Sequence, residues 1–269
     1  WAHTVASFDI LRTRFVWDGV DSPVQVVEKT SGLPFEELDA SSEADVEAYL
    51  VRDRELGFDL GRAPVMRIGL IHTGEASGVM VWSHHHVLMD GWSVPQVFGA
   101  VFSSYDEIRR GRAGPAVRTV PFRRYIAWLV RQSTAAAETY WRSELAGFEE
   151  MTSLEDMRLG VALGSSAVGS SSDNSIERLC SVATSEALSR FAREQQVTLS
   201  TVAQFAWANV LSLYGRSRDV VFGTTVSGRS SGEVVGIEQV VGLLINSLPT
   251  RVQLRGDQRV GDALRVMQQ

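Results

Sequence analysis

The sequence is poor in cysteine and lacks long apolar runs. Of its 269 residues only Cys180 is a cysteine, which excludes an internal disulfide and suits a reducing cytoplasm. No apolar stretch reaches the length of a membrane span, and no signal peptide is recognisable. The sequence therefore predicts a cytoplasmic protein with no membrane partner.

Positive charge is also in short supply. The chain has 26 Lys and Arg against 32 Asp and Glu, for a net charge of -6, so we expect no general attraction to nucleic acid or to anionic membranes. The apolar fraction of 44% and the charged fraction of 22% are typical of a globular protein. Trp1 and Gln269 both fall in mid-pattern, which we interpret as a fragment of a larger protein.

Strand and helix patterns alternate irregularly along the chain, which predicts an α+β fold. Runs of β-branched and aromatic residues predict strands, and apolar residues at helical spacing after a capping residue predict helices. Ser93 is expected to cap one of these helices. The expected strands cover 11–17, 24–27, 65–71, 78–83, 220–226 and 248–254, and the expected helices cover 42–56, 122–145, 185–195, 200–214 and a segment beginning at 93.

The segment 160–175 is the one stretch of low complexity. Its glycines and serines cannot bury enough apolar area to offset the entropy lost on ordering, so the composition predicts a linker. We therefore expect a first lobe at 1–160, a linker at 161–175 and part of a second lobe at 176–269.

Residues 84–93 form the most informative stretch, because they place three histidines, an acid and a glycine at the end of an apolar strand. Histidine is the side chain whose ordinary pKa allows proton transfer near neutral pH. Glycine allows the backbone to come close to a substrate. This combination indicates chemistry that involves a proton.

Four explanations compete for this run. Packing alone rarely needs three histidines beside Asp-Gly. A metal site is suggested by strand alternation, which puts His84 and His86 on one face, but Leu88 and Met89 stand where His-x-His metal hydrolases usually continue with further ligands. A nucleophile triad lacks its Gly-x-Ser-x-Gly turn. We favour a histidine that acts directly on the substrate, supported by Asp90.

The run also matches a family signature. The chain resembles the condensation domains of nonribosomal peptide synthetases, relatives of chloramphenicol acetyltransferase, whose His-His-x-x-x-Asp-Gly motif is met by His85, His86, Asp90 and Gly91, followed by Trp92-Ser93. Four further stretches are similar to family motifs in the same order, namely 11–15 (Arg-Thr-x-Phe), 122–129 (an aromatic helix), 222–229 (ending in Gly-Arg) and 241–251 (Val-Gly-x-x-x-Asn-Thr-x-Pro-x-Arg).

The resemblance implies two chloramphenicol acetyltransferase-like lobes in a V-shaped pseudo-dimer, the second incomplete, with a tunnel between them. The implied reaction is amide-bond formation between a donor acyl or peptidyl thioester and an acceptor aminoacyl thioester, of the type that joins two L-residues. The implied partners are upstream and downstream peptidyl carrier proteins and an adjacent adenylation domain. No cofactor would be bound directly, because the carriers present 4'-phosphopantetheine thioesters. The alternatives are a stand-alone acyl-CoA-dependent acyltransferase and a non-catalytic or truncated domain.

The resemblance assigns the chemistry to the histidine run. His86 would face the reacting amine, as a base or by positioning it, and His85, on the opposite side of an extended backbone, would support it. Asp90 would hold the turn. An uncompensated buried charge is costly, so Asp90 needs a partner, for which Arg12 and Arg229 are the candidates.

Four more residues are assigned to the site. Gly91 would let the backbone approach the thioester, and Trp92 would line the channel or fill the lobe. The helix that begins at Ser93 points its positive end at the site, which favours a developing anion. Asn246 would donate a hydrogen bond across the tunnel or stabilise a turn.

Overall fold

The structure, a computed structural model, describes residues 1–112, 114, 117, 119–149, 152, 177–230 and 232–268. They belong to two compact units, Trp1–Gln132 with Val226–Asn246 and Ser133–Thr225 with Ser247–Gln269. The predicted linker 161–175 lies outside the described residues, so the predicted lobe boundaries stay predictions. The units differ from those lobes in two respects. The second unit begins at Ser133, within the predicted first lobe, and Val226–Asn246, called the crossing segment below, packs within the first unit.

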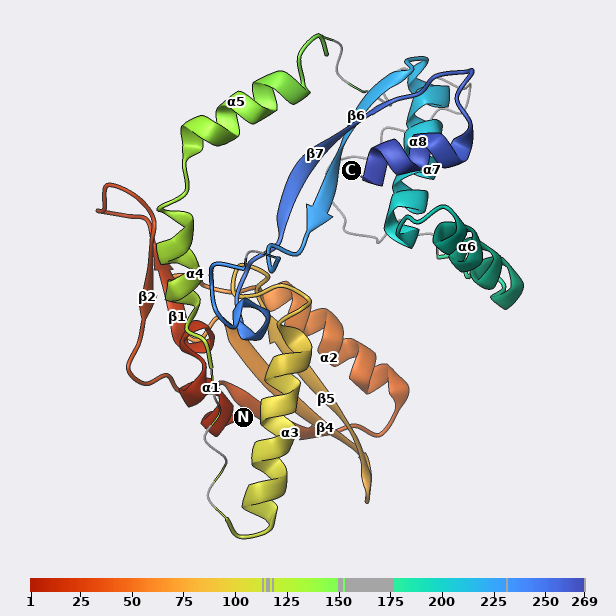
Figure 1. The fold of residues 1–269 in the computed structure, drawn as a ribbon. Helices are drawn as coiled ribbons and strands as arrows, with labels where there is room; N and C mark the ends of the chain where they lie inside the picture. Colours follow the sequence, from red (N-terminus) through yellow and green to blue (C-terminus); the bar gives the residue numbers. More distant parts are fainter. Residues whose placement is uncertain are drawn as a thin grey trace. The chain divides into compact units, whose positions relative to one another are not determined.

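The first unit is mixed α and β (Figure 1). Its elements in chain order are α1 (Ala2–Ser7), the short 3-10 helix η1 (Asp9–Arg12), β1 (Thr13–Val16), β2 (Val24–Val27), β3 (Phe35–Asp39), α2 (Glu43–Leu56), β4 (Met66–Gly74), β5 (Ser77–His84), α3 (Val94–Arg109), α4 (Phe122–Leu129) and the short 3-10 helix η2 (Ile237–Gln239).

A three-stranded sheet with the order β3-β4-β5 carries the histidine run at the end of β5. β4 runs parallel to β3 and antiparallel to β5, so two of the expected strands, 65–71 and 78–83, are paired neighbours in this sheet. Neighbouring residues of a strand point to opposite faces: Gly69 of β4 lies against the Tyr49 ring of α2, whereas Trp82 of β5 contacts Phe98 of α3. The helices α2 and α3 therefore cover opposite faces of the sheet (Figure 1).

The core of the first unit joins segments far apart in sequence. Leu88 and Met89, directly after the histidines, are fully buried in the same cluster as Val240 and Leu244 of the crossing segment. Burying apolar side chains of this size contributes roughly 1.5–3 kcal/mol each. The burial of Leu88 and Met89 therefore fixes the segment that carries the histidines to the core of the first unit.

The crossing segment is held to the first unit by contacts on two helices. The Trp128 indole of α4 donates to the Glu233 carboxylate at 2.7 Å, and the Gln96 side chain of α3 donates to the Glu238 carbonyl at 3.0 Å. Val240 pairs with Val120 in an isolated parallel bridge. These contacts explain why this stretch belongs to the first unit.

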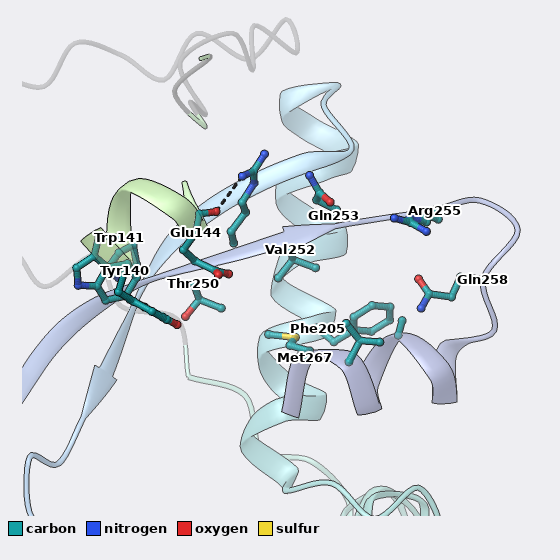
Figure 2. Close-up of a pocket in the computed structure, with 14 residues that line it drawn as sticks. Tyr140, Trp141, Glu144, Phe205, Thr250, Val252, Gln253, Arg255, Gln258 and Met267 are labelled. Carbon is teal, nitrogen blue, oxygen red and sulfur yellow. Dashed lines mark hydrogen bonds between the residues drawn. The ribbon is translucent and has the colours of Figure 1, made fainter. Parts of the chain in front are cut away.

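The second unit contains α5 (Thr134–Glu144), α6 (Val182–Glu194), α7 (Leu199–Gly215), β6 (Asp219–Val226), β7 (Asn246–Gln253) and α8 (Val260–Gln268). The strands β6 and β7 form a two-stranded sheet, and Val220 and Val252 pack on Ala208 and Leu211 of α7. A pocket of about 560 Å³ lies between α5, β7 and α8, with Phe205 and Met267 among its lining residues (Figure 2).

Two expectations about secondary structure need correction. The predicted helix 122–145 is two helices, α4 and α5, because the Ser133 side chain accepts the Ala136 N–H and starts a new helix. The strand β3, with the sequence FEELD, was not predicted, because its acidic residues are unusual in strands. Among the described residues, no helix is long and apolar enough to cross a membrane.

Candidate active site

The histidine run changes direction at the end of β5. The strand ends at His84, and the Leu88 N–H donates to the His85 carbonyl at 3.1 Å, which closes a tight turn. The Val87 N–H donates to Nδ1 of His85 at 3.1 Å. The expectation that His85 and His86 lie on opposite sides of an extended backbone is therefore wrong, because the backbone folds back after His84.

The three histidines differ in exposure. His86 and His85 are exposed on the turn, whereas His84 is partly buried and its ring lies 4.8 Å from the ring of Trp82. Burial lowers the pKa of His84, and the neighbouring histidines act in the same direction. His84 therefore favours the neutral form, and His85 and His86 are the histidines that solvent or a substrate reaches.

Asp90 is the buried centre of the site. Its carboxylate, fully shielded from solvent, accepts hydrogen bonds from Arg229 Nη1 at 2.8 Å and Nη2 at 2.9 Å. It also accepts the N–H groups of Leu244 at 2.9 Å and Ile245 at 3.3 Å, and that of Ser93 at 3.2 Å. Burial alone would raise the pKa of Asp90, but the Arg229 and Leu244 hydrogen bonds outweigh it and lower the pKa below its ordinary value.

Of the two arginines expected to partner Asp90, the structure brings only Arg229 to it. Arg12 instead pairs with Asp9 at 2.6 Å and donates a second hydrogen bond to the Glu28 carbonyl. The cause is local, because Asp9 lies three residues before Arg12 in η1 and faces it directly. Arg12 therefore holds β2 near η1 and does not contact the carboxylate of Asp90.

Ser93 is the second residue whose place differs from expectation. It stands at the N-cap of α3, but its φ and ψ are helical and its side chain caps no N–H of the helix. The hydroxyl contacts Asp90 and the backbone of Gly242 instead. The predicted side-chain cap is therefore wrong, because the hydroxyl is hydrogen-bonded to the buried carboxylate and to the crossing segment in place of the helix N–H groups.

The remaining candidate residues lie around this centre. Gly91 is exposed, and no heavy atom outside its neighbours lies within 4 Å of the place a Cβ would occupy. Trp92 is 57% exposed, so in the described residues it fills no core. Asn246 begins β7, directly after Ile245, whose N–H binds Asp90.

Sequence reasoning missed the backbone of the crossing segment as part of the site. The N–H groups of Leu244 and Ile245 complete the shell around Asp90, yet apolar side chains carry no sign of that role. The signal in the sequence was the glycine at position 242, which marks a place where the backbone can pack closely. In the structure a Cβ there would collide with the Phe122 ring. The described residues contain no group of three His, Cys, Asp or Glu side chains that could hold a metal ion.

Comparisons with known proteins agree along the whole chain. Residues 1–269 match the family model described as the condensation domain. A linear gramicidin synthase from Brevibacillus parabrevis is 40% identical over 280 residues, and bacitracin synthase 3 of Bacillus licheniformis is 36% identical over 264 residues. These alignments cover 100% and 97% of this chain but 4% of each relative, so the chain spans a small part of the relatives' length.

Solved structures show the same fold. The first condensation domain of the calcium-dependent antibiotic synthetase, in complex with a substrate analogue, aligns with a TM-score of 0.75 at 20% identity, over 99% of this chain and 61% of that one. The X-domain from teicoplanin biosynthesis aligns with a TM-score of 0.77 at 24% identity, over 98% of this chain and 59% of that one.

Proposed function

Because this chain belongs to the condensation-domain family, we propose that it forms amide bonds within a nonribosomal peptide synthetase. The donor is an acyl or peptidyl thioester, the acceptor is an aminoacyl thioester, and both are presented on the 4'-phosphopantetheine arms of carrier proteins. The amine attacks the thioester carbonyl, the C–N bond forms, and the carrier thiolate leaves. Upstream and downstream carriers and an adjacent adenylation domain are the proposed partners, in the cytoplasm.

One observation carries the proposal: an exposed His86 on a turn fixed by a buried, fully partnered Asp90. The attacking amine must lose a proton as the bond forms, and the imidazole of histidine is the side chain suited to accepting one near neutral pH. A rigid turn keeps that imidazole in place at little entropic cost. His86 is therefore the proposed catalytic residue, as base or as the group that positions the amine.

The neighbouring residues take supporting roles in this proposal. The His85 ring accepts the Val87 N–H, so it stabilises the turn. The open space at Gly91 lets the thioester approach the backbone, and exposed Trp92 lines its path. Asn246 donates a hydrogen bond to the bound substrate, and the N-terminus of α3 favours the developing oxyanion. The motif around Asp90 favours the subtype that joins two L-residues.

His86→Ala tests the proposal in the complete synthetase that contains this domain, with donor and acceptor carriers loaded. We expect amide formation to fall by about 10²–10⁴-fold, the range for loss of a general base, with the unfolding temperature unchanged because His86 is exposed. Product is measured by mass spectrometry of the acceptor carrier. His72→Ala is the matched control, since His72 is a histidine on β4 with a partly exposed side chain, paired with Glu37.

The outcomes separate the alternatives. Unchanged turnover by His86→Ala contradicts the catalytic role of His86. A wild-type protein that accepts acyl-CoA but not a carrier-bound donor is a stand-alone acyltransferase. A wild-type protein that binds carriers but transfers nothing is a docking module.

A further inference from the structure

The hydroxyl of Ser93 has four polar contacts, although Ser93 has no part in the chemical step proposed above. The residue is fully buried. Its Oγ lies 3.0 Å from Asp90 Oδ1, 3.0 Å from the Gly242 carbonyl, 3.1 Å from the Gly242 nitrogen and 3.1 Å from Arg229 Nη2. One hydroxyl thus joins the start of α3, the buried ion pair and the crossing segment, which lies about 150 residues away in sequence.

The hydrogen-bonding capacity of the hydroxyl is fully used. A serine hydroxyl has one proton to donate and two lone pairs to accept with. The Gly242 N–H and Arg229 Nη2 take the two lone pairs, and the proton goes to Asp90 Oδ1 or to the Gly242 carbonyl. That carbonyl also accepts the Asp90 N–H at 3.2 Å. Both polar groups of Gly242 are therefore held by residues of the Asp90 turn.

We propose, on the basis of the function proposed above, that Ser93 is a positioning residue for the condensation reaction. It fixes Gly242, and through the next residues it sets the Leu244 and Ile245 N–H groups on Asp90 Oδ2. Asn246 follows directly in the chain. The same hydroxyl therefore sets the distance between the turn that carries His86 and the backbone that carries Asn246. Ser93 itself is buried and does not touch the substrate.

The position of reacting groups affects turnover more than substrate binding. A displacement of about 1 Å at a site can lower a rate by about 10²-fold, because the reacting atoms no longer meet in the productive geometry. Removing a group that acts only on this geometry lowers kcat with little change in KM. A purely structural serine would lower the unfolding temperature and leave kcat of the folded protein unchanged.

The test is Ser93→Ala in the complete synthetase, with kcat and KM measured for both loaded carriers well below the unfolding temperature of each variant. We expect kcat to fall about tenfold and both KM values to stay within about twofold. Ser104→Ala is the matched control, because Ser104 is a similarly buried serine of α3, the helix that Ser93 precedes, and its hydroxyl has no hydrogen-bond partner among the described residues. It should keep wild-type kcat.

A second variant covers loss of folding. Where Ser93→Ala does not fold, Ser93→Cys is measured, since a thiol fills a similar space but bonds weakly; a reduced kcat supports the proposal. Wild-type kcat in the folded Ser93 variant overturns it, as does an equal loss in Ser104→Ala. Absence of amide formation by the wild-type synthetase would instead contradict the proposed function, so the two failures are distinguishable.

Discussion

Each of the two units contains an arginine–aspartate pair joined by two hydrogen bonds, and the pairs differ in which partner is the centre. In the first unit the centre is Asp90, which accepts hydrogen bonds from Arg229, from the Ser93 hydroxyl and from three backbone N–H groups. In the second unit it is Arg251, which donates to Asp219 at 2.9 and 2.7 Å. Arg251 also donates to two carbonyls at the end of α5, one of them that of Glu144 (dashed line in Figure 2).

The difference follows from burial. The Asp90 side chain is 0% exposed and that of Asp219 is 32% exposed. A carboxylate without water needs protein donors for all its lone pairs, so Asp90 fixes the backbone of a distant segment. Water can complete the shell of Asp219, so the second pair fastens only the end of α5. A buried carboxylate thus organises a site, whereas an exposed one attaches an element.

The largest expected effect is on the free energy of unfolding when each of the two carboxylates is removed. Asp90→Ala should lower the free energy of unfolding by about 3–5 kcal/mol, because it leaves Arg229 buried and unpaired. Asp219→Ala should cost about 1 kcal/mol, since the pair is partly exposed. Urea unfolding of the complete domain measures both. Equal losses would show that burial does not distinguish the pairs. A stable but inactive Asp90→Ala would assign Asp90 a chemical role.

The next comparison uses two glycines near Asp90. Gly242→Ala should cost about 1–3 kcal/mol of unfolding free energy, because its Cβ would collide with the Phe122 ring in a packed core. Gly91→Ala should change stability by less than about 0.5 kcal/mol, since its Cβ meets open space and its φ is not positive.

Activity separates the same two glycines further. If Gly91 is needed for the approach of the thioester, Gly91→Ala lowers turnover of a fully folded domain. Wild-type turnover in that variant would remove Gly91 from the proposed site. A stable Gly242→Ala would show that the crossing segment can move away from α4.

The sequence predicted most of the helices and strands and the two candidate partners of Asp90, but not which of the two arginines binds it. The start of the helix predicted at 42–56 was readable locally, because Ser42 is a capping residue, and α2 begins at Glu43 directly after it. The choice between Arg12 and Arg229 was not readable, because it depends on Asp9 being three residues from Arg12 in a turn and on the crossing segment folding back. The strand 78–83 was predicted to within one residue of its observed end at His84, but the turn after it was missed, because apolar Val87 to Met89 continue the pattern of a strand while the backbone turns.

The last comparisons concern pH and then salt, which has the smallest expected effect. The pKa of Asp219 lies below its ordinary value, mainly through the Arg251 hydrogen bonds, and that of Asp90 does so despite burial. A carboxyl with a lowered folded pKa stabilises the fold above its unfolded pKa, about 3.9, and this contribution is lost as the pH falls through the folded pKa. The stability difference between wild type and Asp90→Asn should therefore be constant from pH 7 to about 5 and should close below about 4.

Salt should then separate the two pairs at constant pH. At 1 M NaCl the screening length falls to about 3 Å, and ions reach only charges in contact with solvent. At pH 7 the difference between wild type and Asp219→Asn should shrink by a few tenths of a kcal/mol, on the order of an exposed pair, while the difference for Asp90→Asn should hold. Urea unfolding at low and high salt measures both differences. If both stability differences shrank equally at high salt, solvent ions would reach Asp90, and its pair with Arg229 would be screened like the exposed Asp219–Arg251 pair.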